Sequence, residues 1–399
     1  MTTADRLKTL SQQLAELSAE LQSNPERFEA YNDEQANLAQ TCAKVLESVQ
    51  GPSTYINSMI TQMAHFTALR LFIEWGVFDA IPSQEFIPLQ DLAKKVNVDV
   101  QLITRFSRIL VAQGALKQNG SKSLAHTSIS MMFTRESPMN NLIRMGYDDH
   151  LQSCSRILSF FRKYGAQEPQ GRLGTVFAFA CGDPNLTVWE HMNRSPERMK
   201  NFMVSMVAMS QKLSITGSYD FSWVLDPKYK ERTLIVDVGG GKGHALQAIH
   251  DITPGLPMDR CVVQDLDVVV AESQKVAEGP LSQAQFNASD FHQAQPTNGA
   301  LIYYIRRCLH DYGDPDCVEM LQHIQRSMAD DSRLIIAEQI LSDRPSLMAS
   351  ATDIYMLTLG GKERTLEDFR SITTDAGLEI VEIHGSEGHD LALIECKKI

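Results

Sequence analysis

The sequence lacks long hydrophobic runs, closely spaced cysteines and an excess of positive charge. No apolar segment reaches the roughly 18–20 residues that span a bilayer, which excludes a helical membrane protein. The seven cysteines are scattered without a CxxC pair, so we expect reduced thiols and neither a disulfide framework nor a metal site. Asp and Glu outnumber Lys and Arg by 49 to 37, which argues against nucleic acid or an anionic membrane as the main partner.

What is present is the composition of a folded globular protein. The chain has 399 residues, of which 43% are hydrophobic and 22% charged. At about 150 residues per domain, this length predicts two or three domains. The N-terminus, MTTADRLKTLSQQ, is polar and has no secretory apolar segment, so we expect a cytoplasmic protein.

The first 50 residues are predicted to form a helical arm. Asn24-Pro25 should end its first helix. So short a stripe of leucines does not make a stable isolated coiled coil, so the helix either packs on its own protein or crosses to a second subunit. The stripe repeats at spacings of three and four residues: Leu7, Leu10, Leu14, Leu17 and Leu21.

Residues 51–150 show a winged-helix-like pattern. An apolar helix is expected over 55–82, followed by two short helices and a hairpin at Asn119-Gly120. The stretch 88–124 is locally basic, so a winged-helix DNA-binding protein is one alternative. The acidic total and the absence of a long basic stripe favour instead a buried winged helix that serves as a dimerisation domain.

From residue 231, apolar strands alternate with helices, which is typical of a doubly wound α/β sheet. The run TLIVDV at 233–238 is apolar throughout, as a strand covered on both faces requires. Further strands are expected within 260–266, 284–290, 300–310 and 333–340, and two closing strands within 378–385 and 389–398.

A glycine-rich loop follows the first of these strands. Gly239, Gly241 and Gly243 let the backbone turn sharply and approach a ligand. The spacing differs from the GxGxxG dinucleotide fingerprint, and Lys242 is not followed by the Ser or Thr of a P-loop.

Acidic residues stand at the carboxyl ends of three successive strands: Asp237, Asp265 and Asp290. Parallel sheets bind ligands at this edge. A ligand with a ribose, a base and a positive charge suits these carboxylates, and S-adenosylmethionine has all three. Asp237 would instead repel the pyrophosphate of NAD.

Six ordered segments carry a family resemblance. The chain resembles the class I S-adenosylmethionine-dependent O-methyltransferases of small molecules, of the plant caffeic-acid and flavonoid type and its fungal secondary-metabolite relatives. The likeness covers roughly residues 55–399 and includes GVFDAIP and LAHTSIS upstream. The six segments are VDVGGGKG (236–243), QDL (264–266), SDF (289–291), RRCLHDYGD (306–314), IIAEQIL (335–341) and GGKERT (360–365).

The resemblance implies a fold, a cofactor and a partner. It implies a Rossmann-like methyltransferase domain at 151–399, with a mixed seven-stranded sheet and helices on both faces. It also implies a mostly helical dimerisation domain at 51–150, S-adenosylmethionine as cofactor, and a homodimer whose N-terminal domain contributes to each active site.

The resemblance also assigns residues. His310 matches the general base, Glu338 and Glu363 match the acids beside it, and Asp311 matches the floor of the acceptor pocket. To the cofactor contacts implied by the resemblance we add Asp237, from the strand before the loop, and Gly241, from the loop itself. The full set is Asp237, Gly239, Gly241, Asp265, Asp290, Phe291 and Arg306.

The chemistry explains why a histidine is needed. A phenol ionises near pH 10 and a histidine near 6.5, so full proton transfer costs on the order of 5 kcal/mol. The proton must therefore leave as the methyl group arrives, or the acceptor must be more acidic, as an enol is. A carboxylate on the other ring nitrogen, from Glu338 or Glu363, would hold the tautomer.

Three residues keep alternatives open. Arg307 stands where the family often has an aromatic or apolar residue, and is either solvated or aimed at an anionic or carbonyl-bearing acceptor. His126 and Met206 either pack in a core or approach the acceptor. Arg307 and His126 also leave room for an enzyme that uses bound S-adenosylmethionine without consuming it, for a dehydration or a pericyclic rearrangement.

Overall fold

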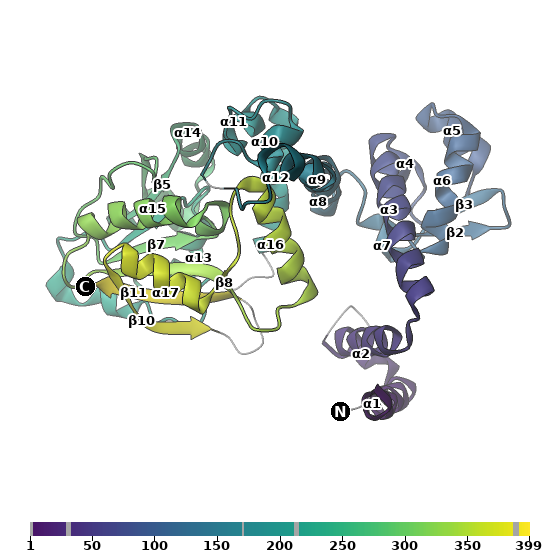
Figure 1. Cartoon of the computed structure of the whole chain (residues 1–399), viewed down its shortest axis with the longest axis horizontal. Helices are drawn as coiled ribbons and strands as arrows, with labels where there is room; N and C mark the ends of the chain where they lie inside the picture. Colours follow the sequence, from purple (N-terminus) through teal and green to yellow (C-terminus); the bar gives the residue numbers. More distant parts are fainter. Residues whose placement is uncertain (1–2, 29–32, 170, 211–214, 386–390) are drawn as a thin grey trace. The chain divides into compact units, whose positions relative to one another are not determined.

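The computed structural model describes residues 3–28, 33–169, 171–210, 215–385 and 391–399 (Figure 1). They form two compact units, Met1–Met131 and Met132–Ile399. Within the described residues, no helix is both long and apolar enough to cross a bilayer. The expected division at residues 50 and 150 stays a prediction.

The first unit is mostly helical. The predicted stop at Asn24-Pro25 is confirmed, because α1 ends at Ser23. Helix α1 packs against α2 and buries Leu10, whereas a crossing to a second subunit stays a prediction. The elements are α1 (Thr3–Ser23), η1 (Pro25–Phe28), α2 (Asp33–Val49), α3 (Pro52–Glu74), α4 (Val77–Ala80), β1 (Ile87–Pro88), α5 (Leu89–Val96), α6 (Val100–Ala112), β2 (Leu116–Asn119), β3 (Ser123–His126) and α7 (Ser128–Met131).

The winged-helix-like pattern is confirmed in this unit. Helices α5 and α6 meet at a turn in which Asn97 has a φ of 54°, and β2 and β3 form an antiparallel hairpin joined by β1. The single helix expected over 55–82 is wrong. The chain turns at Gly76, whose left-handed φ of 66° ends α3 and starts the short helix α4.

The second unit begins with helices and continues as a sheet wrapped by helices. The predicted strands are present, although residues 389 and 390 lie outside the described part of the chain. The elements are α8 (Pro138–Met145), η2 (Gly146–Leu151), α9 (Gln152–Tyr164), α10 (Val176–Ala180), α11 (Val188–Asn193), α12 (Pro196–Ser210), η3 (Ser222–Leu225), η4 (Pro227–Tyr229), β4 (Ile235–Val238), α13 (His244–Ile252), η5 (Met258–Arg260), β5 (Cys261–Asp265), α14 (Asp267–Val276), η6 (Gly279–Gln283), β6 (Gln285–Ala288), β7 (Ile302–Arg306), η7 (Leu309–Asp311), α15 (Asp314–Ser327), β8 (Arg333–Leu341), α16 (Leu347–Leu359), β9 (Arg364–Thr365), α17 (Leu366–Asp375), β10 (Leu378–Gly385) and β11 (Leu391–Lys398).

The main sheet is mixed and has the order β10-β11-β8-β7-β4-β5-β6, with β9 paired to β8. The strands from β8 to β6 are parallel, and β11 runs antiparallel to both of its neighbours. The chain crosses from β6 to β7 beside β4, so the strand order reverses at the carboxyl ends of β4 and β7. Ligands bind parallel sheets at such a point.

Helices cover both faces of this sheet, so the core has two layers. On one face Val236 and Tyr303 pack with residues of α15 and α17, and on the other Ile235 and Tyr304 pack with residues of α13. The expectation that 233–238 is covered on both faces is confirmed. The buried sheet is therefore a rigid base for the loops at its edge.

Candidate functional site

Asp237 is a buried carboxylic acid at the carboxyl end of β4. It is 1% exposed, and its Oδ2 has no hydrogen-bond partner among the described residues. Burial raises the pKa of Asp237 to about 7, although the charge of Arg306 works in the opposite direction. An orphaned acid of this kind is costly, and it would be satisfied by a ligand that brings a hydrogen-bond donor or a positive charge.

Two glycines of the loop after β4, Gly239 and Gly240, leave no room for a side chain. A Cβ on Gly239, whose φ is 68°, would lie 2.8 Å from Cys308 Sγ. A Cβ on Gly240 would lie 2.5 Å from Asp237 Oδ2. Close approach therefore requires both glycines, and at Gly239 the left-handed backbone conformation requires glycine as well.

Asp265 ties the glycine loop to β5. Its carboxylate accepts hydrogen bonds from the backbone N–H of Gly241 at 2.9 Å and of Leu266 at 2.8 Å. Burial raises the pKa of Asp265, and these two hydrogen bonds partly oppose the rise. A carboxylate oxygen can accept a further hydrogen bond, so Asp265 can hold the loop and a ribose hydroxyl together.

The remaining predicted cofactor residues gather at the same edge of the sheet. Asp290 follows β6 and accepts a hydrogen bond from the backbone N–H of His292. The ring of Phe291 lies beside Gly239, and Arg306 ends β7 close enough to lower the pKa of Asp237. An orphaned acid, a glycine cradle and an aromatic ring at one edge fit S-adenosylmethionine, which has an ammonium group, a ribose and a base.

His310 lies in the turn η7 directly after β7, beside this edge. Its Nδ1 is 2.9 Å from Glu363 Oε1, and its Nε2 is 3.6 Å from Asp311 Oδ1. Burial and Arg307 lower the pKa of His310, but Asp311, Glu338 and the hydrogen bond to Glu363 outweigh them and raise it above its ordinary value. The ring is therefore a stronger proton acceptor than a free imidazole.

The two candidate acids have different positions. Burial favours the neutral form of Glu363, but its contacts with His310 and Arg307 leave its pKa below the ordinary value. Glu338, at 1% exposure in β8, accepts a hydrogen bond from the backbone N–H of Leu309 at 2.9 Å. Of the two, Glu363 is therefore the hydrogen-bond partner of the His310 ring, and Glu338 holds the turn that carries it.

Arg364 is a positioning residue that our sequence reasoning missed. It is 1% exposed and donates to the backbone carbonyls of Leu309 and Tyr312, on either side of His310, at 2.9 and 2.8 Å. It also pairs with Asp314 at the start of α15. Its only sequence signal was its place inside the GGKERT segment, which does not show that a buried guanidinium staples the turn.

Gly361 lets the segment before Arg364 approach the same turn. A Cβ on Gly361 would overlap the carbonyl oxygen of His310. The backbone N–H of Lys362 donates to that same oxygen at 3.0 Å. The backbone around His310 is therefore fixed from two directions.

Arg307 points into the carboxylate cluster. Its Nη1 is 3.4 Å from Glu363 Oε1 and 3.9 Å from Glu338 Oε2, and its side chain is 19% exposed. It is also one of two non-glycine residues with positive φ in the described chain, at 53°. A strained backbone at this position aims the guanidinium at the acids beside His310.

The two other predicted residues are His126, in the first unit, and Met206, in the second. The ring nitrogens of His126 are bonded inside the first unit, to Ser130 Oγ at 2.9 Å and to the carbonyl oxygen of Phe78 at 3.0 Å. Met206 lies half-buried on α12. Their roles towards an acceptor stay predictions.

Two known protein families match this chain. The O-methyltransferase domain family matches residues 161–379, and the O-methyltransferase dimerisation domain matches residues 54–136. The chain is 34% identical to the methyltransferase cfoD of Aspergillus candidus, over 98% of this chain and 99% of that protein.

Two solved structures share the fold over 98% of this chain and the whole of theirs. One is OxaC in complex with SAH and oxaline, with a TM-score of 0.84 and 22% identity. The other is described as a pericyclic reaction enzyme, with a TM-score of 0.82 and 20% identity.

The orphaned acid makes a prediction about pH. Unfolded, Asp237 ionises near 3.8, whereas in the folded protein it stays protonated up to about pH 7. Between these values the folded state holds a proton that the unfolded state releases, so this residue makes stability fall as pH rises, and the loss levels off above pH 7. In the wild type, Asp237 should therefore lower the free energy of unfolding between pH 4 and pH 8. In Asp237→Asn this fall should be smaller by up to about 4 kcal/mol, as measured by urea denaturation.

The same substitution should weaken S-adenosylmethionine binding by about 10–100-fold in calorimetry, because it removes a charge-assisted hydrogen bond. Asp259→Asn, at an exposed position of the same unit, is the control and should change neither measurement. An Asp237→Asn protein that binds the cofactor as tightly as the wild type would contradict the assignment.

Proposed function

This chain belongs to the family of S-adenosylmethionine-dependent O-methyltransferases, and we propose that it methylates a phenol or enol hydroxyl of a small aromatic or polyketide-type metabolite. The observation that carries the proposal is the buried pair of His310 and Glu363 beside the glycine loop. When bound, S-adenosylmethionine supplies an electrophilic methyl group on a sulfonium centre. Asp237, Asp265 and Asp290, with Phe291 and Arg306, would hold it.

Glu363 sets the proton arrangement of His310. A carboxylate 2.9 Å from Nδ1 favours the tautomer in which Nδ1 carries the proton and donates it to Glu363. The lone pair of Nε2 is then free to accept the hydroxyl proton of an acceptor. Asp311 Oδ1, 3.6 Å from Nε2, lies on the side from which that proton arrives.

The charges around His310 favour the imidazolium that this step forms. The carboxylates of Asp311, Glu338 and Glu363 raise the pKa of His310 and so bring it closer to the pKa of a phenol. Each pKa unit of difference between the two groups corresponds to about 1.4 kcal/mol, so these carboxylates directly lower the free-energy cost of moving the proton from the acceptor to His310. An acceptor more acidic than a phenol, such as an enol, would need the least help.

The chain is proposed to act as a homodimer through its first unit. An apolar stripe runs along α3, and each of its residues is more than half exposed in the single chain. The dimerisation domain match covers this helix. No helix of the described residues is long and apolar enough to cross a membrane. An exposed apolar stripe of this kind therefore marks an interaction surface. The stripe is Tyr55, Ile56, Met59, Ile60 and Met63.

A second candidate reaction uses S-adenosylmethionine without consuming it, for a dehydration or a pericyclic rearrangement. Arg307 favours it, since a guanidinium aimed into the site can polarise an acceptor carbonyl. The two reactions differ in mass balance. Methylation forms one S-adenosylhomocysteine and adds one CH₂ for each product, and the rearrangement does neither.

His310→Ala tests the methylation proposal. We expect a panel of phenols and enolic polyketides, screened with methyl-labelled donor, to yield a product whose methyl group lies on oxygen by NMR. His310→Ala should lower the transfer rate by about 10²–10⁴-fold because the base is lost, while cofactor affinity in calorimetry stays unchanged. Unchanged turnover in this variant, or a methyl group on nitrogen or carbon, would overturn the proposal.

The substitution Glu363→Gln should shift the pH profile of kcat/KM. The rate should rise with pH as His310 loses its proton, with a midpoint above the ordinary histidine value. Removing the carboxylate withdraws stabilisation of the imidazolium, so the midpoint of kcat/KM should move to lower pH and the plateau rate should fall. Glu367→Gln, an exposed acid on α17, should leave both unchanged. A midpoint that stays fixed in Glu363→Gln would rule out its role.

The double variant Ile56→Glu with Ile60→Glu tests the dimer. It places two charges one turn apart on the α3 stripe and removes two apolar side chains worth about 1.5–3 kcal/mol each when buried. Light scattering should show a dissociation constant raised by about 10²-fold or more. Leu158→Glu, at a 60% exposed leucine of α9, should remain dimeric. A double variant that dimerises as the wild type does would place the interface elsewhere.

A further inference from the structure

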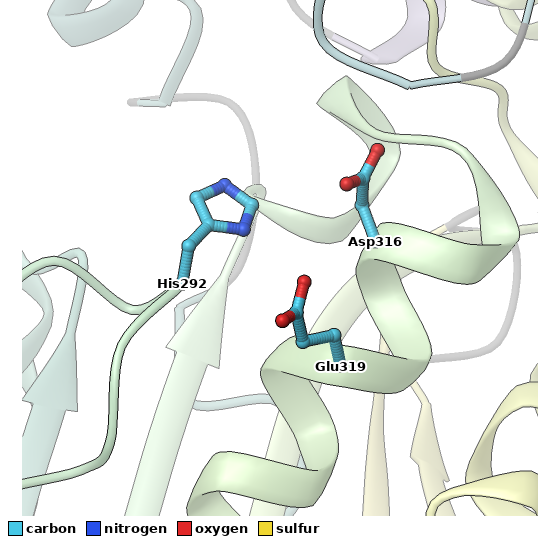
Figure 2. Close-up of side chains that lie close together, drawn as sticks. All are labelled: His292, Asp316 and Glu319. Atoms are coloured by element: carbon cyan, nitrogen blue, oxygen red, sulfur yellow. The ribbon is translucent and has the colours of Figure 1, made fainter.

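A second group of metal-ligand side chains lies outside the His310 cluster. His292 follows β6, and Asp316 and Glu319 lie three residues apart in the first turns of α15, on one face of the helix. The donor atoms of the three residues are all within 4.8 Å of one another. Figure 2 shows the His292 ring facing the two carboxylates across a gap.

His292 is the independent sign that a ligand belongs in this gap. His292 is only 7% exposed, yet neither of its ring nitrogens, Nδ1 or Nε2, has a hydrogen-bond partner in the described chain. Asp316 Oδ2 is likewise buried without a partner. Buried polar atoms are nearly always satisfied, and an imidazole that offers both nitrogens to nothing needs an explanation.

The ring of His292 is held in place by packing. It lies edge to face against Tyr312, with ring centroids 4.8 Å apart, and against Phe291, at 5.0 Å. The Tyr312 hydroxyl accepts a hydrogen bond from Trp189 Nε1 at 3.0 Å, which steadies that neighbour. The orientation of the imidazole towards the carboxylates is therefore built into the core.

One charge opposes a cation here. Arg172 Nε lies 3.9 Å from Asp316 Oδ1, and its side chain is 42% exposed. The contact is long and leaves Asp316 Oδ2 unused. Since Arg172 is largely solvated, it can turn away when a metal ion neutralises the carboxylate.

We propose that His292, Asp316 and Glu319 bind a divalent transition-metal ion of the Zn²⁺ type, with water completing the coordination. One imidazole and two carboxylates suit Zn²⁺, whereas Mg²⁺ and Ca²⁺ prefer oxygen ligands alone. Zinc bonds of about 2.0–2.2 Å require the donors to close inward, which the half-exposed Glu319 can do by rotating its side chain.

The bound ion is a structural tie and is independent of the proposed reaction. It joins the loop that carries Asp290 and Phe291 to α15, two segments that β7 separates in the sequence. A metal bridge between them restrains the loop at the edge of the sheet. The ion would stabilise the folded state by linkage, because the unfolded chain does not assemble these ligands.

The test is Zn²⁺ titration of the full-length protein after chelator treatment and dialysis. Calorimetry should show one Zn²⁺ per chain, the melting temperature should rise with Zn²⁺ but not with Mg²⁺, and Co²⁺ should give the visible absorption of a low-coordinate site. His292→Leu and Asp316→Asn should each weaken Zn²⁺ binding by about tenfold or more, since even residues outside the coordination sphere commonly matter by 10–100-fold. His292→Leu should not lower the melting temperature of the metal-free protein, because it removes two buried nitrogens that have no hydrogen-bond partner.

The matched control is the group Glu382, His384 and Glu395, which offers the same donor types on β10 and β11. There, His384 Nε2 already lies 3.0 Å from Glu395 Oε2, so His384→Asn should leave Zn²⁺ affinity unchanged. Arg172→Gln should tighten binding several-fold, because it removes the opposing charge. Zn²⁺ affinity that survives His292→Leu, falls in His384→Asn, or is matched by Mg²⁺ would overturn the proposal.

Discussion

The hydrogen bond between the His310 ring and Glu363 is the contact on which the site depends. A buried imidazole is useful as a base only if one nitrogen is held by an acceptor and the other is left open. Keeping Glu363 in place requires the close approach of Gly361, the staple made by Arg364, and the hydrogen bond from the Glu363 backbone N–H to Asp353. The segments from β7 and from β9 therefore act as one unit.

This arrangement concentrates unsatisfied acid at one edge of the sheet. Asp237, Glu338 and Glu363 each keep one buried carboxylate oxygen without a hydrogen-bond partner in the described chain. Such groups cost stability in the protein alone, and they favour positive charge wherever it arises, on a bound sulfonium ligand or on a protonated histidine. The buried acids therefore make the folded protein less stable, but they set up the electrostatic environment of the site before any ligand binds.

Most of this framework could be predicted from the sequence because its signals are local. The apolar run before Gly239 indicates a strand covered on both faces, and acids at strand ends lie together whenever the strands are parallel. The helix stop at Asn24-Pro25 and the hairpin at Asn119-Gly120 are equally short-range. The break at Gly76 was missed, because the apolar pattern continues across it and hides a single left-handed residue.

The sequence by itself therefore determined the order of the chemical groups along the chain: the glycine loop, the acids at the strand ends, the histidine, and the two glutamates of the family segments. Only the tertiary structure decided that Glu363 contacts the His310 ring while Glu338 holds the Leu309 backbone, and that Arg307 turns towards both acids. It also placed His292 beside Asp316 and Glu319, the group at which we propose a metal ion. These contacts join residues far apart in the chain, and their partners are selected by packing in three dimensions, which no local pattern of residue types records.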